Sequence, residues 1–215
     1  MMDLFGNSTD WTEKLKPILT KYKGQKHPLE YHNLYQLMVM VVLSAQDSDA
    51  NINKIAPALF DAYPNMESLA VTNEEALFPY ISEVRNFGTK AKWLLEIAKT
   101  VQNDANIPLT MEGLVALKGI GRKSANVIMR EAKILAEGII ADLHVIRVAP
   151  RIGLISETKD GIKAEKQLMQ VLPKEIWGEI GMAISFLGRE ICRPQPKCPE
   201  CPINSICQYY KKIKG

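Results

Sequence analysis

The sequence predicts an all-α protein, and three observations support this class. Apolar residues recur at spacings of three and four along most of the 215-residue chain, strand-like alternation is absent, and the connections between periodic segments are short. A composition of 47% hydrophobic and 24% charged residues is ordinary for a globular protein with a packed core. We therefore expect about ten helices joined by short loops.

Two of the expected helices are marked most clearly by their apolar residues. The segment 31–45 places Leu34 and Met38 on one stripe with further apolar residues on its flanks, so this helix should be buried on most sides. The segment 89–103 is amphipathic. The other expected helices span 52–63, 65–69, 72–77, 111–117, 121–137, 143–152, 162–172 and 176–187. After Cys192 the chain is rich in proline and should form loops.

The charge of the chain is nearly balanced but unevenly placed. Lysine and arginine number 27 against 24 acidic residues, a net charge of +3, and cations gather in the stretches 118–133 and 189–215. Such patches suit a phosphate backbone, although a solvated lysine face has the same composition. The longest apolar run, 37–43, is too short to span a membrane, and the first residues lack a secretion-signal pattern. We expect a soluble, cytoplasmic protein, associated with the nucleoid if its source is bacterial.

Residues 117–125 read LKGIGRKSA and join two predicted helices. Glycines on both sides of Ile120 allow positive φ and bring backbone N–H groups to the surface where the second helix begins, a position that attracts anions. Ile120 would anchor the turn in the core. A tight turn between any two packed helices also uses glycine, but the complete string is more specific and favours a phosphate-binding hairpin.

Lys123 is unusual for its position in this hairpin. A cation in the first turn of a helix opposes the helix dipole, at a cost of about 0.3–1 kcal/mol at an exposed site. The same field, combined with partial burial, favours the neutral amine, which is a nucleophile where an ammonium is not. The alternative role is a lysine that only binds phosphate.

Asp142 is a single acid among apolar residues, directly before a predicted helix. An aspartate in this context commonly serves as an N-cap. Capping and catalysis are compatible, since a capping carboxylate at the edge of a pocket is held firmly in place. His144, two residues later, is expected to be structural rather than catalytic.

Four cysteines lie close together, at positions 192, 198, 201 and 207, with the spacing C-x5-C-x2-C-x5-C. In a reducing compartment such a group indicates a metal rather than disulfides. The spacing and the absence of a nearby histidine leave zinc and a [4Fe–4S] cluster open. Either would fold the basic tail into a defined loop.

These motifs together resemble the endonuclease III family, over roughly residues 25–210. The matching strings are Leu43-Ser44-Ala45-Gln46 with Asp49, the hairpin 117–127, Asp142-x-His144-x-x-Arg147-Val148 and the four cysteines Cys192, Cys198, Cys201 and Cys207. The resemblance implies a two-lobed helix-hairpin-helix fold with DNA in the cleft between the lobes. One lobe, 26–137, has six helices and carries the hairpin. The other combines 1–25 with 138–215 and holds a [4Fe–4S] loop at 192–207.

The resemblance also implies the reaction: base-excision repair by a DNA glycosylase with associated AP lyase activity. Lys123 would attack the deoxyribose C1′, displace a damaged and pyrimidine-derived base, and form a Schiff base that permits β-elimination of the 3′ phosphate. Asp142 would stabilise the sugar cation and help to activate Lys123. The implied partner is double-stranded DNA with damaged bases or abasic sites, bound by a monomer.

Further residues of the family pattern correspond to DNA and ion contacts. Gln46 matches the residue that fills the gap left by the flipped base. The carbonyls of Val115, Leu117 and Ile120 would hold a monovalent cation, Na⁺ or K⁺. The expected DNA contacts are Gln46, Arg85, Asn86, Lys118, Gly119, Ile120, Gly121, Arg122, His144 and Lys197.

The chain departs from the family pattern at several positions. Five residues separate Cys192 from Cys198, where six are usual. The remaining departures are Arg85-Asn86-Phe87 in place of a Gly-Leu-Tyr-like turn, Lys118 for proline, Leu143 for threonine, and Val115 for a pocket glutamate. They bear on the substrate range, which would be narrower or altered, 5-hydroxymethyluracil being one example. Two alternatives remain: a DNA-binding accessory protein without catalysis, and a monofunctional glycosylase in which Asp142 directs water.

Overall fold

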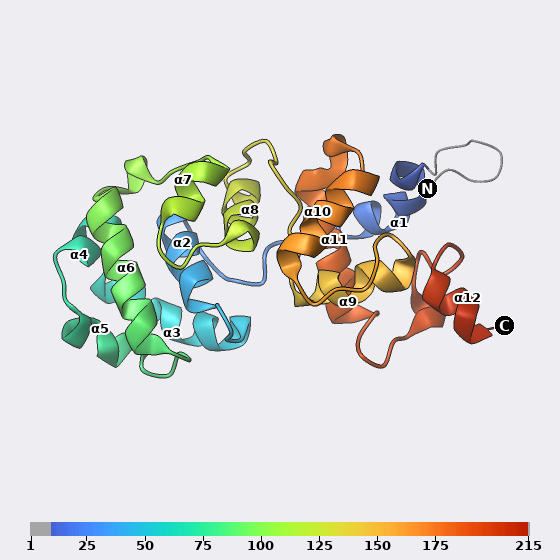
Figure 1. Cartoon of the computed structure of the whole chain (residues 1–215). Helices are drawn as coiled ribbons and strands as arrows, with labels where there is room; N and C mark the ends of the chain where they lie inside the picture. Colours follow the sequence, from blue (N-terminus) through green and yellow to red (C-terminus); the bar gives the residue numbers. More distant parts are fainter. Residues whose placement is uncertain (1–9, 215) are drawn as a thin grey trace. The chain divides into compact units, whose positions relative to one another are not determined.

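The structure is a computed structural model that describes residues 10–214. Within this range the chain forms α-helices and short 3-10 helices, and no strand occurs (Figure 1). The all-α class is therefore confirmed. The chain divides into two compact units. We call Lys26–Ile134 the hairpin unit, and the described parts of the chain before and after it, up to Gln25 and from Leu135, the discontinuous unit.

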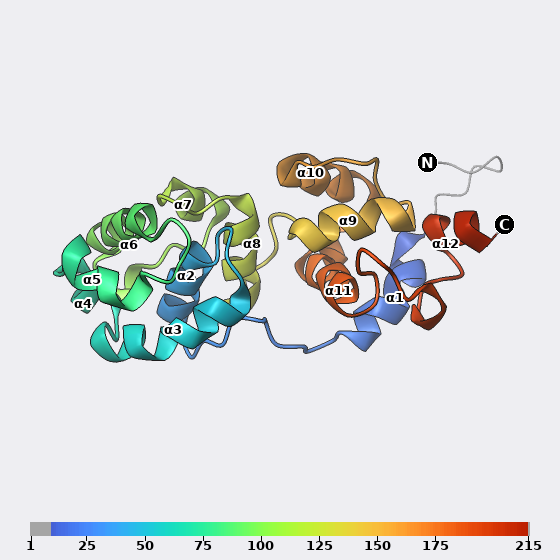
Figure 2. The same cartoon turned by 90° about the horizontal axis from the view of Figure 1, so that it is seen from below.

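The hairpin unit is organised around α2. Its elements are α2 (Leu34–Leu43), α3 (Asp49–Ala62), α4 (Met66–Ala70), α5 (Glu74–Ile81), α6 (Phe87–Val101), η1 (Asp104–Asn106), α7 (Met111–Ala116) and α8 (Arg122–Glu131). Helix α2 packs against α3, α6 and α8 (Figure 2). Eight of its ten residues are buried, as its continuous apolar sequence predicts. It begins later than expected because Asn33 caps it, accepting a 2.8 Å hydrogen bond from the Gln36 N–H.

Helix α8 ends at Glu131, so the expected helix over 121–137 was too long. Lys133 takes a left-handed conformation with φ +59°. Its N–H donates to the Arg130 carbonyl at 2.9 Å, and the Ile134 N–H donates to the Met129 carbonyl at 2.8 Å. This pair of bonds closes the helix in the way that a C-terminal glycine usually does. The sequence does not predict this helix end, because lysine, unlike glycine, is not typical of a left-handed C-terminal position.

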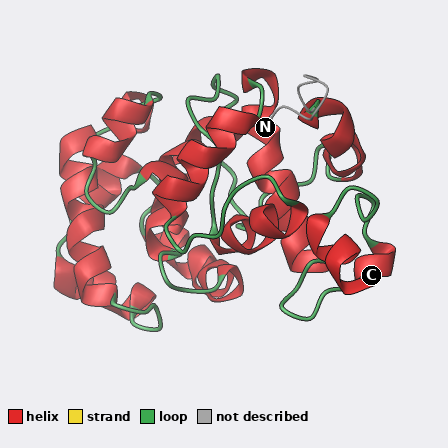
Figure 3. Cartoon of the chain, turned by 45° about the vertical axis from the view of Figure 1, so that its right-hand side comes forward, coloured by secondary structure: helices red, strands yellow, loops and turns green. Residues whose placement is uncertain are grey.

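The discontinuous unit contains α1 (Trp11–Lys21), α9 (Leu143–Ile152), α10 (Gly161–Val171), η2 (Lys174–Ile176), α11 (Trp177–Glu190), η3 (Cys198–Glu200) and α12 (Gln208–Lys214). Figure 3 shows these helices and the loops between them. Helix α11 packs against α9 and α1, and every residue from Ile180 to Gly188 is buried. Two helices were missed by the sequence reasoning: α1, and α12, which lies in a segment expected to be loop.

No helix within residues 10–214 combines the length and apolar character needed to cross a bilayer.

Candidate functional site

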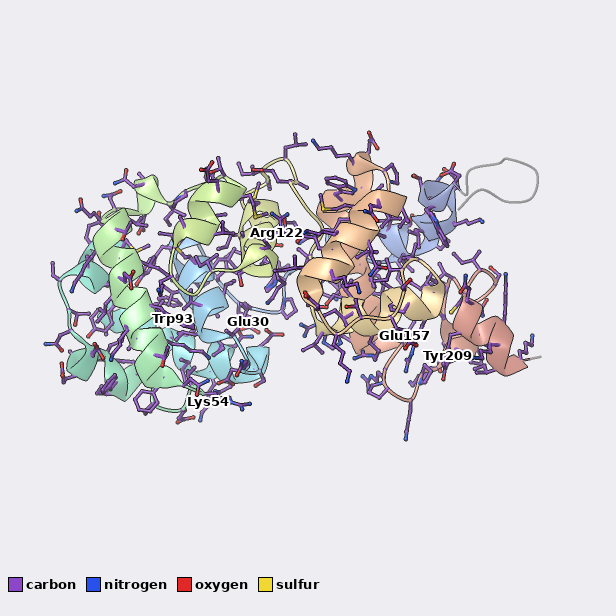
Figure 4. The ribbon with its side chains drawn as sticks, viewed as in Figure 1. Glu30, Lys54, Trp93, Arg122, Glu157 and Tyr209 are labelled. Atoms are coloured by element: carbon purple, nitrogen blue, oxygen red, sulfur yellow. The ribbon has the colours of Figure 1, made fainter. Side chains whose placement is uncertain are left out.

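The turn between α7 and α8 forms the hairpin that the sequence predicts. Leu117 and Ile120 are buried, which confirms that Ile120 anchors the turn. Gly119 has φ +80°, and a Cβ built there would lie 2.5 Å from Cε3 of Trp93 on α6. Figure 4 shows Trp93 projecting from α6 and Arg122 at the start of α8. Gly119 is therefore required by its backbone conformation and by its contact with Trp93.

Gly121 has a different role from Gly119. Its φ is −94°, so of the two hairpin glycines only Gly119 uses the positive φ that glycine allows. A Cβ at Gly121 would meet nothing within 4 Å. Gly121 is the N-cap of α8, and glycine offers no side-chain acceptor to the N–H groups of the first turn. That helix start remains suited to an external anion such as phosphate.

Lys123 is the second residue of α8, and its side chain is exposed. Lys123 therefore lacks the partial burial that was considered for it from the sequence. The reason is that the packed part of α8 begins at Ala125, two residues further along. Lys118 is also exposed, whereas Arg122 is half-buried. The hairpin thus presents an accessible amine beside a helix start.

Val115, one of the residues whose carbonyls are expected to hold a cation, is 40% exposed.

Two exposed loops of the hairpin unit lie beside one another. One carries Gln46, between α2 and α3, and the other carries Arg85 and Asn86, between α5 and α6. Gln46 has φ +59° and Asn86 has φ +57°. The Arg85 N–H donates a 2.8 Å hydrogen bond to Oδ2 of Asp47. The structure therefore brings together the two expected DNA-opening segments. Asp47, which joins them, was not found by sequence reasoning.

Asp142 caps α9, as the sequence predicts. Its Oδ1 accepts hydrogen bonds from the N–H groups of His144 and Val145, at 2.9 and 2.8 Å. Its Oδ2 accepts a 2.6 Å bond from the hydroxyl of Ser185 on α11 and lies 4.0 Å from Nη2 of Arg189. The side chain is 14% exposed. Each carboxylate oxygen is thus held by a separate helix.

Close packing of α11 is needed for this arrangement. A Cβ at Gly181 would lie 2.5 Å from the Ile140 carbonyl oxygen, so only glycine lets α11 approach the segment that leads into Asp142. Ser185 lies one helical turn after Gly181 and is fully buried. Sequence reasoning missed Ser185, which stands in an apolar run and is 43 positions from its partner.

His144 contacts Arg147 on the same helix. Its Nδ1 lies 3.1 Å from Nη2 of Arg147. Arg147 in turn donates to the carbonyls of Gly188 and Cys192, at 3.0 and 3.2 Å. This chain of contacts links the first turn of α9 to the start of the cysteine loop. Leu143, next to Asp142, is 68% exposed and lines an open cavity of about 480 Å³.

The four cysteines line one small cavity together with Ile191, Pro196, Asn204, Tyr209 and Tyr210. All four are free of disulfides. Within residues 10–214 no group of three or more His, Cys, Asp or Glu side chains is placed to hold a metal ion. The donor set around the cavity is nevertheless made of soft sulfur atoms, which suit iron–sulfur clusters and zinc. Burial raises the pKa of Cys201 to about 11 and that of Cys198 above its usual range.

Arg151 holds the short loop between the first two cysteines. Its Nη1 donates to the Arg193 carbonyl at 2.8 Å and lies 3.5 Å from the sulfur of Cys192. Its Nη2 donates to the Pro194 carbonyl at 3.3 Å. The guanidinium also stacks 4.9 Å from the ring of Tyr209 on α12. Lys197, in the same loop, is exposed and lies 3.9 Å from Glu200.

A third cavity, of about 910 Å³, lies in the hairpin unit between the segment 26–36, helix α3 and Glu131. None of the predicted site residues lines it. The predicted site residues therefore lie on the hairpin, the paired loops, α9 and the cysteine loop, and not in this cavity.

Comparison with known proteins agrees with these features. The family model of the HhH-GPD superfamily of base excision DNA repair proteins matches residues 39–174. Endonuclease III of Synechocystis sp. is 34% identical over 199 residues, which are 91% of this chain and 90% of that protein. Endonuclease III of Bacillus subtilis is 35% identical over 187 residues, 86% of this chain and 85% of that protein.

Solved structures give the same result. The structure of a trapped endonuclease III–DNA covalent intermediate has 30% identity and a TM-score of 0.85, covering 97% of this chain and 99% of that one. A thermostable thymine-DNA glycosylase, at 21% identity and a TM-score of 0.81, shares the fold. Since the family model spans more than half of the chain and the relatives match over nearly their full length, the protein belongs to the endonuclease III family within the HhH-GPD superfamily.

Proposed function

We propose that the protein excises damaged bases from double-stranded DNA and then cleaves the abasic strand, with Lys123 as the nucleophile. The observation that carries the proposal is the exposed amine of Lys123 in the first turn of α8, beside a glycine N-cap, in a member of a base-excision repair family. The helix start binds a DNA phosphate, and the amine is then available to the sugar of a flipped nucleotide.

The proposed reaction uses the lone pair of the Lys123 Nζ. It forms a bond to C1′ while the glycosidic bond breaks and its electron pair leaves with the base. The nitrogen then loses a proton, and the C1′–O4′ bond breaks with its electron pair passing to O4′, which takes up a proton; the opened sugar is left as an iminium ion, the Schiff base. The iminium acidifies the proton on C2′, and loss of that proton expels the 3′ phosphate with the electron pair of its C3′–O bond.

Asp142 contributes a fixed negative charge to this reaction. Its carboxylate accepts hydrogen bonds on both oxygens, so it does not reorient when positive charge develops on the sugar. We propose that it stabilises that charge and assists deprotonation of Lys123. In the monofunctional alternative Asp142 would direct a water, and base release would then occur without a strand break.

DNA contacts are proposed for the residues around these two groups. Backbone N–H groups at Gly119–Arg122 would bind phosphate, with Lys118, His144 and Lys197 contributing contacts elsewhere on the backbone. Gln46, Arg85 and Asn86 would occupy the gap left by the flipped nucleotide. A polar wedge at Arg85–Asn86 and an exposed Leu143 beside Asp142 favour a narrower set of pyrimidine-derived lesions, such as 5-hydroxymethyluracil.

The cysteine loop would hold a [4Fe–4S] cluster through Cys192, Cys198, Cys201 and Cys207. Four free thiols around one cavity support this assignment. The cluster would fold the segment 192–207 and its cations into a defined loop. A Na⁺ or K⁺ ion is proposed at the carbonyls of Val115, Leu117 and Ile120. The protein would act as a monomer where the chromosome lies, which is the cytoplasm if the source is bacterial.

The test is a cleavage assay on duplexes that each carry one damaged base or one abasic site, with borohydride to reduce the Schiff base. Wild-type protein should form a covalent DNA complex, and Lys123→Gln should not. Lys99→Gln is the matched control, since it removes an exposed lysine of the same unit that has no proposed contact with DNA. Full trapping by Lys123→Gln would exclude Lys123 as the nucleophile. DNA binding without base release from any duplex would favour the non-catalytic accessory protein.

A further inference from the structure

Lys90 is a buried cation that the proposed reaction does not use. It lies on α6, its exposure is 2%, and its Nζ donates to the carbonyls of Leu43 and Ala45 at 2.7 and 2.6 Å. The Leu43 carbonyl is the last of α2, where helix carbonyls lack intrahelical partners and attract cations, and the Ala45 carbonyl lies in the turn that follows. The next residue along the chain is Gln46, so Lys90 fixes the backbone from which Gln46 projects.

Asp47 directly follows Gln46, and its carboxylate accepts hydrogen bonds on both oxygens. Its Oδ1 accepts from the Ser48 N–H at 2.8 Å and from the Asn51 side-chain amide at 3.1 Å. Its Oδ2 accepts from the Arg85 N–H at 2.8 Å. Burial raises the pKa of Asp47, but these hydrogen bonds and the charge of Lys90 outweigh it, so the carboxylate is ionised. Burial lowers the pKa of Lys90, and the negative charge of Asp47 partly offsets this.

The backbone on both loops is unusual at the residues that face solvent. Gln46 and Asn86 each adopt left-handed φ without being glycine, which costs free energy and persists only where neighbouring contacts enforce it. Lys90 binds the carbonyl of the residue before Gln46, and the Asp47 carboxylate binds the N–H of the residue before Asn86. Asn51 reinforces these contacts, since its amide also donates to the Glu83 carbonyl at 3.2 Å, on the second loop.

We propose that Asp47 and Lys90 are positioning residues that hold the Gln46 loop and the Arg85–Asn86 loop as one rigid wedge for opening the DNA duplex. The inference rests on the proposed function in one respect, that these loops enter the DNA. A carboxylate is needed at position 47 because one oxygen accepts from Ser48 and Asn51 while the other accepts from Arg85. An asparagine has one acceptor oxygen, so its amide would present N–H groups to either Arg85 or Ser48.

The test measures duplex opening without requiring catalysis. The probe is a duplex with one tetrahydrofuran abasic analogue and 2-aminopurine opposite it, titrated to saturation with protein carrying Lys123→Gln. Unstacking of the 2-aminopurine raises its fluorescence. In this background Asp47→Ala and Asp47→Asn should both lose most of the fluorescence rise at saturation, and Lys90→Met should do the same. Asp61→Ala and Lys99→Met, at exposed positions of the same unit, should match the background protein.

A normal fluorescence rise at saturation in Asp47→Asn would overturn the proposal. Asparagine has one acceptor oxygen in place of two, so it cannot accept from both the Ser48 N–H and the Arg85 N–H. A loss of DNA affinity alone, with an unchanged saturating signal, would also overturn it. Thermal unfolding of each variant identifies any that fail to fold, and Asp47→Asn, at a half-buried site, remains informative if Lys90→Met unfolds. Failure of the proposed function appears elsewhere, as absent Lys123-dependent trapping by the wild-type protein.

In a protein with active Lys123, the same variants should separate two substrates. Single-turnover excision of a stacked damaged base should fall roughly tenfold or more, because small misplacements of this kind are costly. Cleavage at a preformed abasic site should fall much less, since no base has to leave the stack. Equal losses on both substrates would show that Asp47 does not act through duplex opening.

Discussion

The hydroxyl of Ser185 donates a 2.6 Å hydrogen bond to Oδ2 of Asp142, from a position on α11 that is fully buried. Arg189, one turn further along α11, lies 3.5 Å from the same hydroxyl and 4.0 Å from the same carboxylate oxygen. The orientation of the acid is therefore set by α11 as much as by the helix that it caps.

Replacement of Ser185 by alanine should slow strand cleavage while preserving the fold. Asp142 would keep its capping bonds through Oδ1 but lose the partner that fixes Oδ2. We expect kcat on an abasic duplex to fall by about tenfold, the free-energy equivalent of one hydrogen bond to a charged group, with a much smaller change in KM. Steady-state kinetics measure both. Ser156→Ala, at an exposed position of the same unit, should be neutral, and a normal kcat in Ser185→Ala would refute the role of this bond.

The local part of this site could be read from the sequence. Asp142 before an apolar helix predicts an N-cap, and the structure places α9 over Leu143–Ile152, the expected range. Ile120 between two glycines predicts a buried anchor, and it is buried. These predictions succeed because the interacting groups are neighbours along the chain.

The remaining features depend on contacts between distant segments. Ser185 is one polar residue in an apolar helix, and Lys90 is one lysine among several on an amphipathic helix. Nothing in the sequence around either residue distinguishes it from other serines and lysines of the chain. The exposure of Lys123 was also missed, because it depends on where the packing of α8 begins.

The two hairpin glycines should respond oppositely to substitution. Gly119→Ala would place a Cβ against Trp93 in a left-handed backbone, so the free energy of unfolding should fall by about 1–3 kcal/mol. Gly121→Ser should instead stabilise the protein by a few tenths of a kcal/mol, because serine caps a helix better than glycine does. Its hydroxyl would occupy the N–H groups proposed for a phosphate, so DNA affinity should fall. Denaturant unfolding and DNA titration separate these effects, and unimpaired DNA binding by Gly121→Ser would contradict the phosphate assignment.

The contact between α1 and α11 should make stability depend on pH at the acid end. Glu190 accepts hydrogen bonds from Tyr22 and Lys21, at 2.7 and 2.9 Å, and these lower its pKa. A carboxyl group with a depressed folded-state pKa stabilises the fold above its unfolded-state value, ordinarily 4.5, and this contribution is lost as the pH falls through the folded-state value. Glu190→Gln should therefore destabilise the protein at pH 7 and flatten the stability profile below about pH 4.5.

Urea unfolding between pH 3 and pH 8 measures this profile. Glu13→Gln is the control, since Glu13 belongs to the same unit and forms only an exposed pair within α1. At high pH the burial of Tyr22 and its bond to Glu190 raise the pKa of the phenol, so the same contact should be lost only at strongly alkaline pH. A profile for Glu190→Gln that is parallel to the wild-type profile would show that the contact does not contribute.

Arg151 should control how well the shortened cysteine loop retains the proposed [4Fe–4S] cluster. The guanidinium binds two carbonyls of the five-residue connection and stacks on Tyr209, so it fixes the first cysteine relative to α12. Arg151→Gln removes the stacking and most of the donors. We expect absorbance near 400 nm in freshly purified protein to decay severalfold faster in air than in the wild type, while helical content measured by circular dichroism is initially unchanged. Lys166→Gln, exposed on α10, should decay at the wild-type rate. Equal decay of all three proteins would show that Arg151 does not help to hold the cluster. A wild-type protein without this absorbance would contradict the iron–sulfur assignment itself.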